Sequence, residues 1–142
     1  YLISIIVKNN NMNTKLNKIL AEISAGELID KITILEIKKE KISNKDKLSE
    51  VEKEFKSLNE TMKKFIPDLL EISKFKNELK DINLKLWDIE NAKRLAEKQN
   101  DFGEHFISLS RSVYKTNDQR AKVKLEINNA LGSNIKEVKS HD

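Results

Sequence analysis

Cysteine is absent from this chain of 142 residues, which also has only one proline and three glycines. The absence of cysteine excludes disulfides, thiolate zinc sites, iron–sulfur clusters and thiol nucleophiles, and it is typical of proteins kept in a reducing compartment. So few turn-forming residues exclude β-sandwiches, β-barrels and doubly wound sheets, which need frequent tight turns. We therefore expect a cytoplasmic, all-α protein.

Metal ligands and long apolar runs are also scarce. The two histidines, His105 and His141, lie far apart and no carboxylates accompany them at a recognisable ligand spacing, so we predict no metal and no cofactor. The apolar run at residues 1–7 is too short to cross a bilayer, and we expect no membrane partner. We expect residues 1–17 to be a flexible or short extended N-terminal segment and residues 18–142 to be a single helical domain.

Charge of one sign is not concentrated anywhere. The 27 Lys and Arg residues exceed the 23 Asp and Glu residues only slightly and alternate with them, whereas a nucleic-acid-binding protein usually collects its basic residues in a patch. Nucleic acid is therefore an unlikely partner. Only three basic residues are arginine: Arg94, Arg111 and Arg120. In a chain that otherwise uses lysine, an arginine indicates a position where the planar guanidinium is needed.

Helix signals, in contrast, are abundant. Ser24 and Glu27 form the pattern of a capping box, which predicts a helix from Ser24 to about Ile42. Apolar residues on two faces of this helix predict that it is buried between neighbours. One face carries Leu28, Ile32, Leu35 and Ile42, and the other carries Ile34 and Ile37.

Three further helices follow. After a turn at residues 43–46, apolar residues repeat at spacings of three and four up to Phe65, and Pro67 then ends that helix. A new helix of about 30 residues is expected to begin at Pro67, and this proline either reverses or kinks the chain. Trp87, on this helix, is expected to pack in a core or a subunit interface. The fourth helix lies between Gly103 and Leu131, with a possible break near Asn117.

The fourth helix also carries two apolar stripes, so it too is expected to be buried on two sides. The second stripe consists of Ile107, Tyr114, Ala121 and Leu125. These patterns together predict an antiparallel helical bundle with long, coiled-coil-like helices.

Three segments resemble a known family. They are GELIDKITILEIK from Gly26, LWDIE from Leu86, and SVYKTNDQRA from Ser112. Together they resemble an uncharacterised bacterial family of short, all-helical proteins that is classed as a domain of unknown function. The resemblance implies a soluble bacterial protein, and it implies no activity, cofactor or partner.

A polar constellation on the first and fourth helices is the best candidate for a site. Two interpretations remain open: a buried ion-pair network that sets the helix register, or a pocket in which arginine or lysine binds a phosphate or carboxylate. In either case we expect Arg120 to be at least half buried and paired with Asp30 or Glu36. The candidate residues are Asp30, Lys31, Glu36, Arg111, Tyr114, Lys115, Asn117, Asp118 and Arg120.

Three functional hypotheses follow. The first is a non-enzymatic helical module for interaction or oligomerisation, with a second copy or another protein as partner, because two helices carry surplus apolar surface. The second is a binding protein or small helical enzyme for an anionic metabolite, acting through the polar constellation. The weakest is RNA binding by a lysine-rich helical hairpin.

Overall fold

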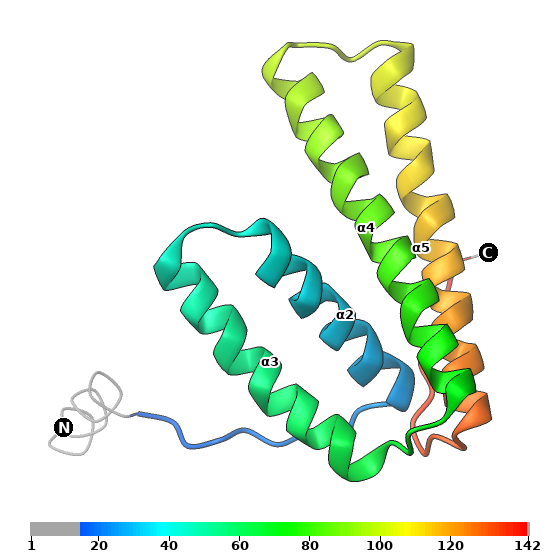
Figure 1. The fold of residues 1–142 in the computed structure, drawn as a ribbon. Coiled ribbons are helices and arrows are strands. Elements are labelled where there is room, and N and C mark those ends of the chain that lie inside the picture. Colours follow the sequence, from blue (N-terminus) through cyan, green and yellow to red (C-terminus); the bar gives the residue numbers. More distant parts are fainter. Residues whose placement is uncertain (1–14, 142) are drawn as a thin grey trace, which may run out of the picture.

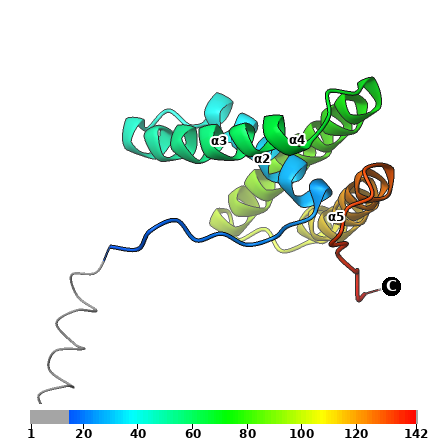
Figure 2. The ribbon, with the colours of Figure 1, turned by 90° about the horizontal axis from the view of Figure 1, so that it is seen from below.

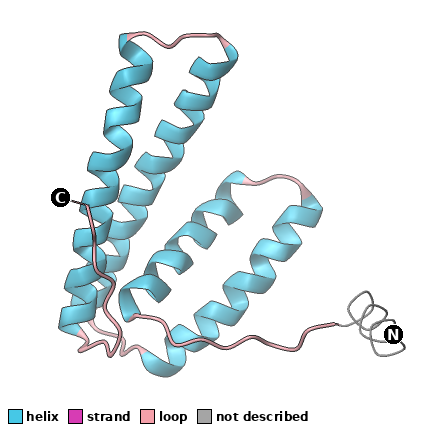
Figure 3. Ribbon diagram, turned by 180° about the vertical axis from the view of Figure 1, so that it is seen from behind, coloured by secondary structure: helices cyan, strands magenta, loops and turns pink. Residues whose placement is uncertain are grey.

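The structure is a computed structural model, which describes residues 15–141 of the chain. It contains the helices α2 (Ala25–Lys41), α3 (Lys45–Phe65), α4 (Leu70–Lys98) and α5 (Glu104–Ala130), and no strand occurs among the described residues (Figures 1 and 3). The prediction of an all-α protein is confirmed. Of the N-terminal segment predicted at residues 1–17, residues 1–14 lie outside the described residues, and residues 15–17 have no regular secondary structure.

Local capping residues set the ends of α2 and α3. The Ser24 hydroxyl accepts a hydrogen bond from the Glu27 N–H at 3.1 Å, and the Asn44 side chain accepts one from the Lys47 N–H at 3.0 Å. Each side chain satisfies a backbone donor that has no partner within its helix. The predicted start of the first helix at Ser24 and its end near Ile42 are thus confirmed.

Pro67 lies in the turn between α3 and α4, where the chain reverses direction (Figure 1). The new helix does not begin at Pro67 itself, as the sequence suggested, but at Leu70. The reason is local: the Leu69 N–H donates to the Pro67 carbonyl at 3.0 Å, which closes a tight turn before helical geometry resumes.

The hairpin of α4 and α5 ends its helices with left-handed residues. Asn100 has φ 52° one residue after the C-cap of α4, and Gly132 has φ 61° one residue after the C-cap of α5. In each case the following N–H bonds to a carbonyl of the last turn, as Ser133 does to Asn128 at 2.8 Å. The helix continues through Asn117, so the break considered there does not exist.

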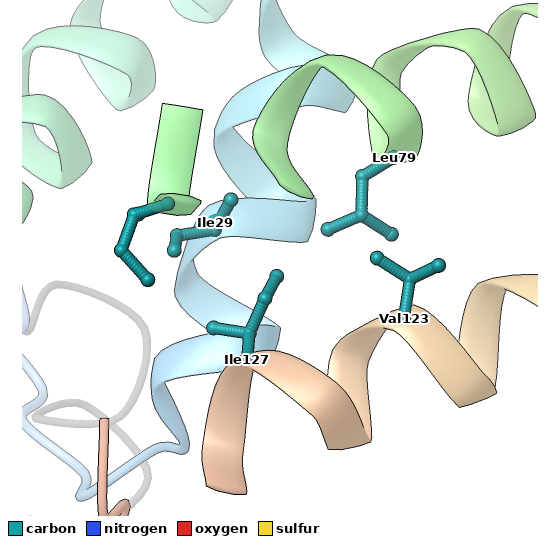
Figure 4. Packing of buried hydrophobic residues seen from close by; sticks show 5 residues of the cluster. Ile29, Leu79, Val123 and Ile127 are labelled. Atoms are coloured by element: carbon teal, nitrogen blue, oxygen red, sulfur yellow. The ribbon is translucent and has the colours of Figure 1, made fainter. Parts of the chain in front are cut away.

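Helix α2 packs against each of the other three helices, whereas α3 packs mainly on α2. Viewed from below, α2 lies between α3 and α5 (Figure 2). Four helices meet around one cluster of buried apolar side chains, in which residues of α2, α4 and α5 point toward one another (Figure 4). The buried members are Ile29, Ile72, Leu79, Val123 and Ile127.

The two faces predicted for the first helix are both buried, since Ile32 and Ile37 on opposite sides of α2 are no more than 1% exposed. The corresponding prediction for the fourth helix is wrong. On α5, Ile107, Tyr114 and Leu125 are each more than two-fifths exposed. Helix α5 lies at the outside of the molecule, so only the stripe that includes Val123 and Ile127 has other helices to pack against.

The two hairpins separate with distance from the core. Near the turn between α3 and α4 they are in contact, and toward their other ends they diverge, with the α4–α5 hairpin extending beyond the α2–α3 hairpin (Figure 1). None of the helices in residues 15–141 is both long and apolar enough to cross a bilayer.

Candidate functional site

Asp30 carries a carboxylate in the centre of the molecule. It lies on the side of α2 that faces α4 and α5, and it is 0% exposed. The guanidinium of Arg120, on α5, binds it through two hydrogen bonds, from Nε to Oδ1 at 2.9 Å and from Nη2 to Oδ2 at 2.5 Å. A planar guanidinium matches a carboxylate in this bidentate geometry, and the ammonium of lysine does not. The predicted ion pair of Arg120 with Asp30 is therefore confirmed.

Helix α4 completes the network with Asn83. Its Nδ2 donates to Asp30 Oδ1 and to the Thr33 hydroxyl, both at 2.9 Å, and that hydroxyl donates to the Asp30 carbonyl at 2.7 Å. Every buried side-chain nitrogen or oxygen in the described residues has a hydrogen-bond partner. A buried charge is tolerated only when it is paired and hydrogen-bonded in this way. The network thus links α2, α4 and α5 in one relative position.

Arg120 is the member of the network that reaches solvent. Its side chain is 28% exposed, so it is well over half buried, as predicted. The hydrogen bonds that Arg120 donates to Asp30 raise the pKa of Arg120, although burial acts in the opposite direction, and the guanidinium therefore stays charged. Pairing with Asp30 uses one N–H of Nε and one of Nη2, which leaves both N–H groups of Nη1 and the second of Nη2 for another partner.

An open cleft of about 530 Å³ lies where the two hairpins diverge, and Arg120 forms part of its wall. Its apolar lining comes from α2 and α4, and its polar lining includes two of the three arginines of the chain. The only tryptophan, Trp87, also lines it. The lining residues are Ile34, Ile37, Lys38, Asn83, Leu86, Trp87, Glu90, Asn91, Arg94, Asn117 and Arg120.

The structure divides the predicted site residues between this cleft and other places. Asn117 and Arg120 line the cleft, and Asp30 accepts hydrogen bonds from Arg120 on the core side. Arg111 and Lys115 instead line a separate, smaller pocket of about 350 Å³ on α5, and Tyr114 is exposed. These three do not join the cleft because α5 presents them on its outer face.

The remaining predicted residues form separate ion pairs. Glu36 pairs with Lys76 at 2.7 Å instead of with Arg120. Lys31 pairs with Glu27 at 3.6 Å within α2, and Asp118 pairs with Lys139 of the C-terminal segment at 2.7 Å. Their charges are thus used in structural contacts on the surface.

The sequence did not assign Arg94, or the face of α4 that carries Trp87, to a site. Trp87, Glu90, Asn91 and Arg94 follow the spacing i, i+3, i+4 and i+7, which places them on one face of a helix. That periodicity was available in the sequence. What it could not show is that α2 leaves this face uncovered.

A second polar cluster lies at the start of α2. Lys124 Nζ donates to Glu27 at 2.5 Å and to Glu137 at 3.0 Å, and the Ser24 hydroxyl donates to Glu137 at 3.3 Å. Burial acts to raise the pKa of Glu27, but the hydrogen bond and charge of Lys124 outweigh it, so that this pKa is lowered. The cluster holds the C-terminal segment alongside α5 (Figure 3).

Among the residues that the structure describes, no group of three His, Asp or Glu residues converges as metal ligands. Fold and cleft together define a small all-helical protein with a cationic, partly apolar cleft between two helical hairpins. Residues 19–142 match the family of unknown function DUF6165, and the chain belongs to that family. Neither a curated protein nor a solved structure matches it.

Proposed function

We propose that this protein binds a small anionic molecule in the cleft between α2, α4 and α5. The observation that carries the proposal is the position of Arg120. Asp30, which Asn83 holds by a hydrogen bond, orients the guanidinium from the core side, and Arg120 also lines the cleft. A charged donor that is oriented before the ligand arrives costs little to organise on binding.

The electrostatics of the lining favour an anion. Asp30 neutralises Arg120, so the surplus charge comes from Lys38 and Arg94, against Glu90 alone. In the described part of the chain neither Lys38 nor Arg94 takes part in an ion pair. The cations of those pairs are Lys31, Lys76, Lys80, Arg120, Lys124 and Lys139. Arg94 is therefore available to a carboxylate or phosphate.

The volume and composition of the cleft also support a small molecule. Ligand sites typically enclose about 300–1,000 Å³ and combine apolar walls with a few convergent polar groups. This cleft, at about 530 Å³, joins four apolar residues to three cations and three amides.

A thermal-shift screen of the full chain against phosphorylated and carboxylated metabolites tests the proposal. A ligand that binds the folded state and not the unfolded chain raises the melting temperature, and the rise grows with the ratio of ligand concentration to Kd. We expect at least one class of anion to do so, and we expect Arg94→Gln to weaken its binding at least tenfold by calorimetry. Arg111→Gln is the matched control, because it removes the one arginine outside the cleft. A flat response across the panel, or equal losses in both variants, would contradict the proposal.

A second candidate function is self-association as a helical interaction module. The observation that favours it is the far end of the α4–α5 hairpin, where Leu95, Phe102 and Ile107 are each more than half exposed. Light scattering after size exclusion should then show a dimer or larger species that Phe102→Ser dissociates, with Tyr114→Ser as control. A strict monomer at every concentration would exclude this candidate.

A further inference from the structure

We infer that the ligand of the cleft is an aromatic monocarboxylate, whose ring lies against Trp87 and whose carboxylate is bound by Arg94. This inference rests on the proposed function and specifies its ligand. Its basis is the order in which α4 presents its residues to the cleft.

Three turns of α4 carry three different kinds of contact. Asn83 lies at the buried end, beside Asp30, and Trp87 follows one turn later. Arg94 is seven residues beyond Trp87, which keeps it on the same face and places its Cα about 10 Å farther along the helix axis. The cleft therefore has a cation at each end, Arg120 and Arg94, with the indole of Trp87 between them.

The walls between the two cations are apolar and belong to both hairpins. Ile34 and Ile37 of α2 line the cleft together with Leu86 and Trp87 of α4. A phosphate or a short aliphatic acid would leave this surface exposed to water. A flat ring would bury it and would stack on the indole, a geometry that aromatic pairs favour.

The carboxylate belongs at Arg94 and not at Arg120. Asp30 already balances the charge of Arg120 and occupies its Nε–Nη2 edge, so the three N–H groups that remain suit a neutral oxygen of the ligand. Arg94 forms no ion pair within the described residues, so its guanidinium can bind a carboxylate through two hydrogen bonds.

Glu90 limits the charge of the ligand. It lines the cleft one helical turn before Arg94, so its carboxylate lies near the anion that Arg94 binds. A second negative charge on the ligand would be repelled there, which disfavours phosphate monoesters and dicarboxylates. A ligand with one ring and one carboxylate meets all three conditions: the ring covers the apolar walls, the carboxylate pairs with Arg94, and no second charge lies near Glu90.

The single tryptophan makes the test site-specific, because Trp87 is the only indole fluorophore of the chain. We would titrate the full chain with 3-phenylpropanoate and follow Trp87 emission, with isothermal calorimetry in parallel. The comparison probes are acetate and inorganic phosphate, which lack a ring, 3-phenylpropanol, which lacks the charge, and phenyl phosphate, which carries a second charge. The variants are Arg94→Gln, Trp87→Phe and Glu90→Gln, with Arg111→Gln as control.

We expect 3-phenylpropanoate to change Trp87 emission and to bind at least tenfold more tightly than acetate, inorganic phosphate or phenyl phosphate. Arg94→Gln should weaken the binding of 3-phenylpropanoate at least tenfold, and Arg111→Gln should leave that binding unchanged. Glu90→Gln should reduce the ratio of the affinity for 3-phenylpropanoate to the affinity for phenyl phosphate. Because the Trp87→Phe variant has no indole emission, its binding is measured by calorimetry. It should bind 3-phenylpropanoate no more than a few-fold more weakly than the parent, because a smaller aromatic ring remains at this position.

The alternative results separate the two proposals. If acetate or phosphate binds as tightly as 3-phenylpropanoate and Arg94→Gln weakens all of them, the aromatic ligand is wrong and the anion site stands. If 3-phenylpropanol binds as tightly as 3-phenylpropanoate, recognition of charge is wrong and both proposals fall. Both also fall if no anion, in the probe set or in the metabolite panel, binds in an Arg94-dependent manner.

Discussion

The carboxylate of Asp30 on α2 and the guanidinium of Arg120 on α5 are joined by two hydrogen bonds, although 90 positions separate them in the chain. Asp30 is fully buried, and Arg120 reaches from the core to the wall of the cleft. One ion pair therefore contributes both to helix register and to the candidate site. Its two roles can be separated by measuring stability and ligand binding in the same variants.

Replacing Arg120 should destabilise the protein. Arg120→Lys keeps the charge but loses the two parallel N–H donors that bind both oxygens of Asp30. We expect this substitution to lower the free energy of unfolding by about 1–3 kcal/mol. Arg120→Ala leaves Asp30 buried without its cation and should cost about 3 kcal/mol or more. Urea denaturation measures both, and Arg111→Ala, on the exposed face of the same helix, should stay within about 0.5 kcal/mol of the parent. An Arg120→Ala value in that same narrow range would refute the buried-network interpretation.

Asn128 should matter far more than its neighbour Asn129. The Asn128 side chain is buried, and its Oδ1 accepts a hydrogen bond from the Gly26 N–H, in the first turn of α2, at 2.7 Å. Asn128→Ala leaves that donor without a partner inside the protein, and we expect a loss of about 1–3 kcal/mol by chemical denaturation. Asn129→Ala, at an exposed position, is the control. Equal stabilities of the two variants would show that water replaces the Asn128 bond without loss.

Gly26 is expected to reject any side chain. A Cβ at this position would lie 2.9 Å from Asn128 Oδ1 and would also meet the backbone carbonyl of Lys124. Alanine is a better helix former than glycine, but crowding of this kind costs about 1–3 kcal/mol and outweighs the gain. Gly26→Ala should therefore lower the melting temperature. At Gly103, the N-cap of α5, the nearest atom to a new Cβ is 3.7 Å away, so Gly103→Ala meets no clash, loses only N-cap preference and should cost less than Gly26→Ala. A neutral Gly26→Ala would mean that α2 and α5 can move apart at this contact.

The pH dependence of stability should include a contribution from Glu27. Its pKa is lowered in the folded protein because Lys124 outweighs the effect of burial, so the folded state binds this proton less readily than the unfolded chain does. The contribution is complete above the unfolded pKa of about 4.3 and is lost as the pH falls through the lower folded value. Glu27→Gln should therefore be less stable than the parent at neutral pH and should approach it in acid. Denaturation curves of the parent and of Glu27→Gln at neutral and at acid pH measure this difference in the free energy of unfolding. A difference that stays the same at both pH values would show that Glu27 contributes through packing alone.

Much of the secondary structure follows from local signals in the sequence. Ser24 and Asn44 cap α2 and α3, Pro67 separates α3 from α4, and Gly132 follows α5 in a left-handed conformation. Each acts on backbone groups within a few residues, so no knowledge of the partner helices is required. The pairing of Arg120 with an acidic residue of α2 was also predictable, because an arginine on a core stripe must find a buried carboxylate.

The sequence by itself therefore determined an all-helical chain, most helix boundaries and the charged residue that the core must neutralise. Tertiary structure alone decided which apolar stripes are covered. Ile107 and Tyr114 on α5 have the periodicity of a buried stripe, but no helix lies over them. It also decided that Arg94 and Trp87 face a cleft, because that depends on where α2 diverges from α4. A helical period specifies which side chains share a face, whereas the position of the neighbouring helix determines whether that face is a core, a surface or a site.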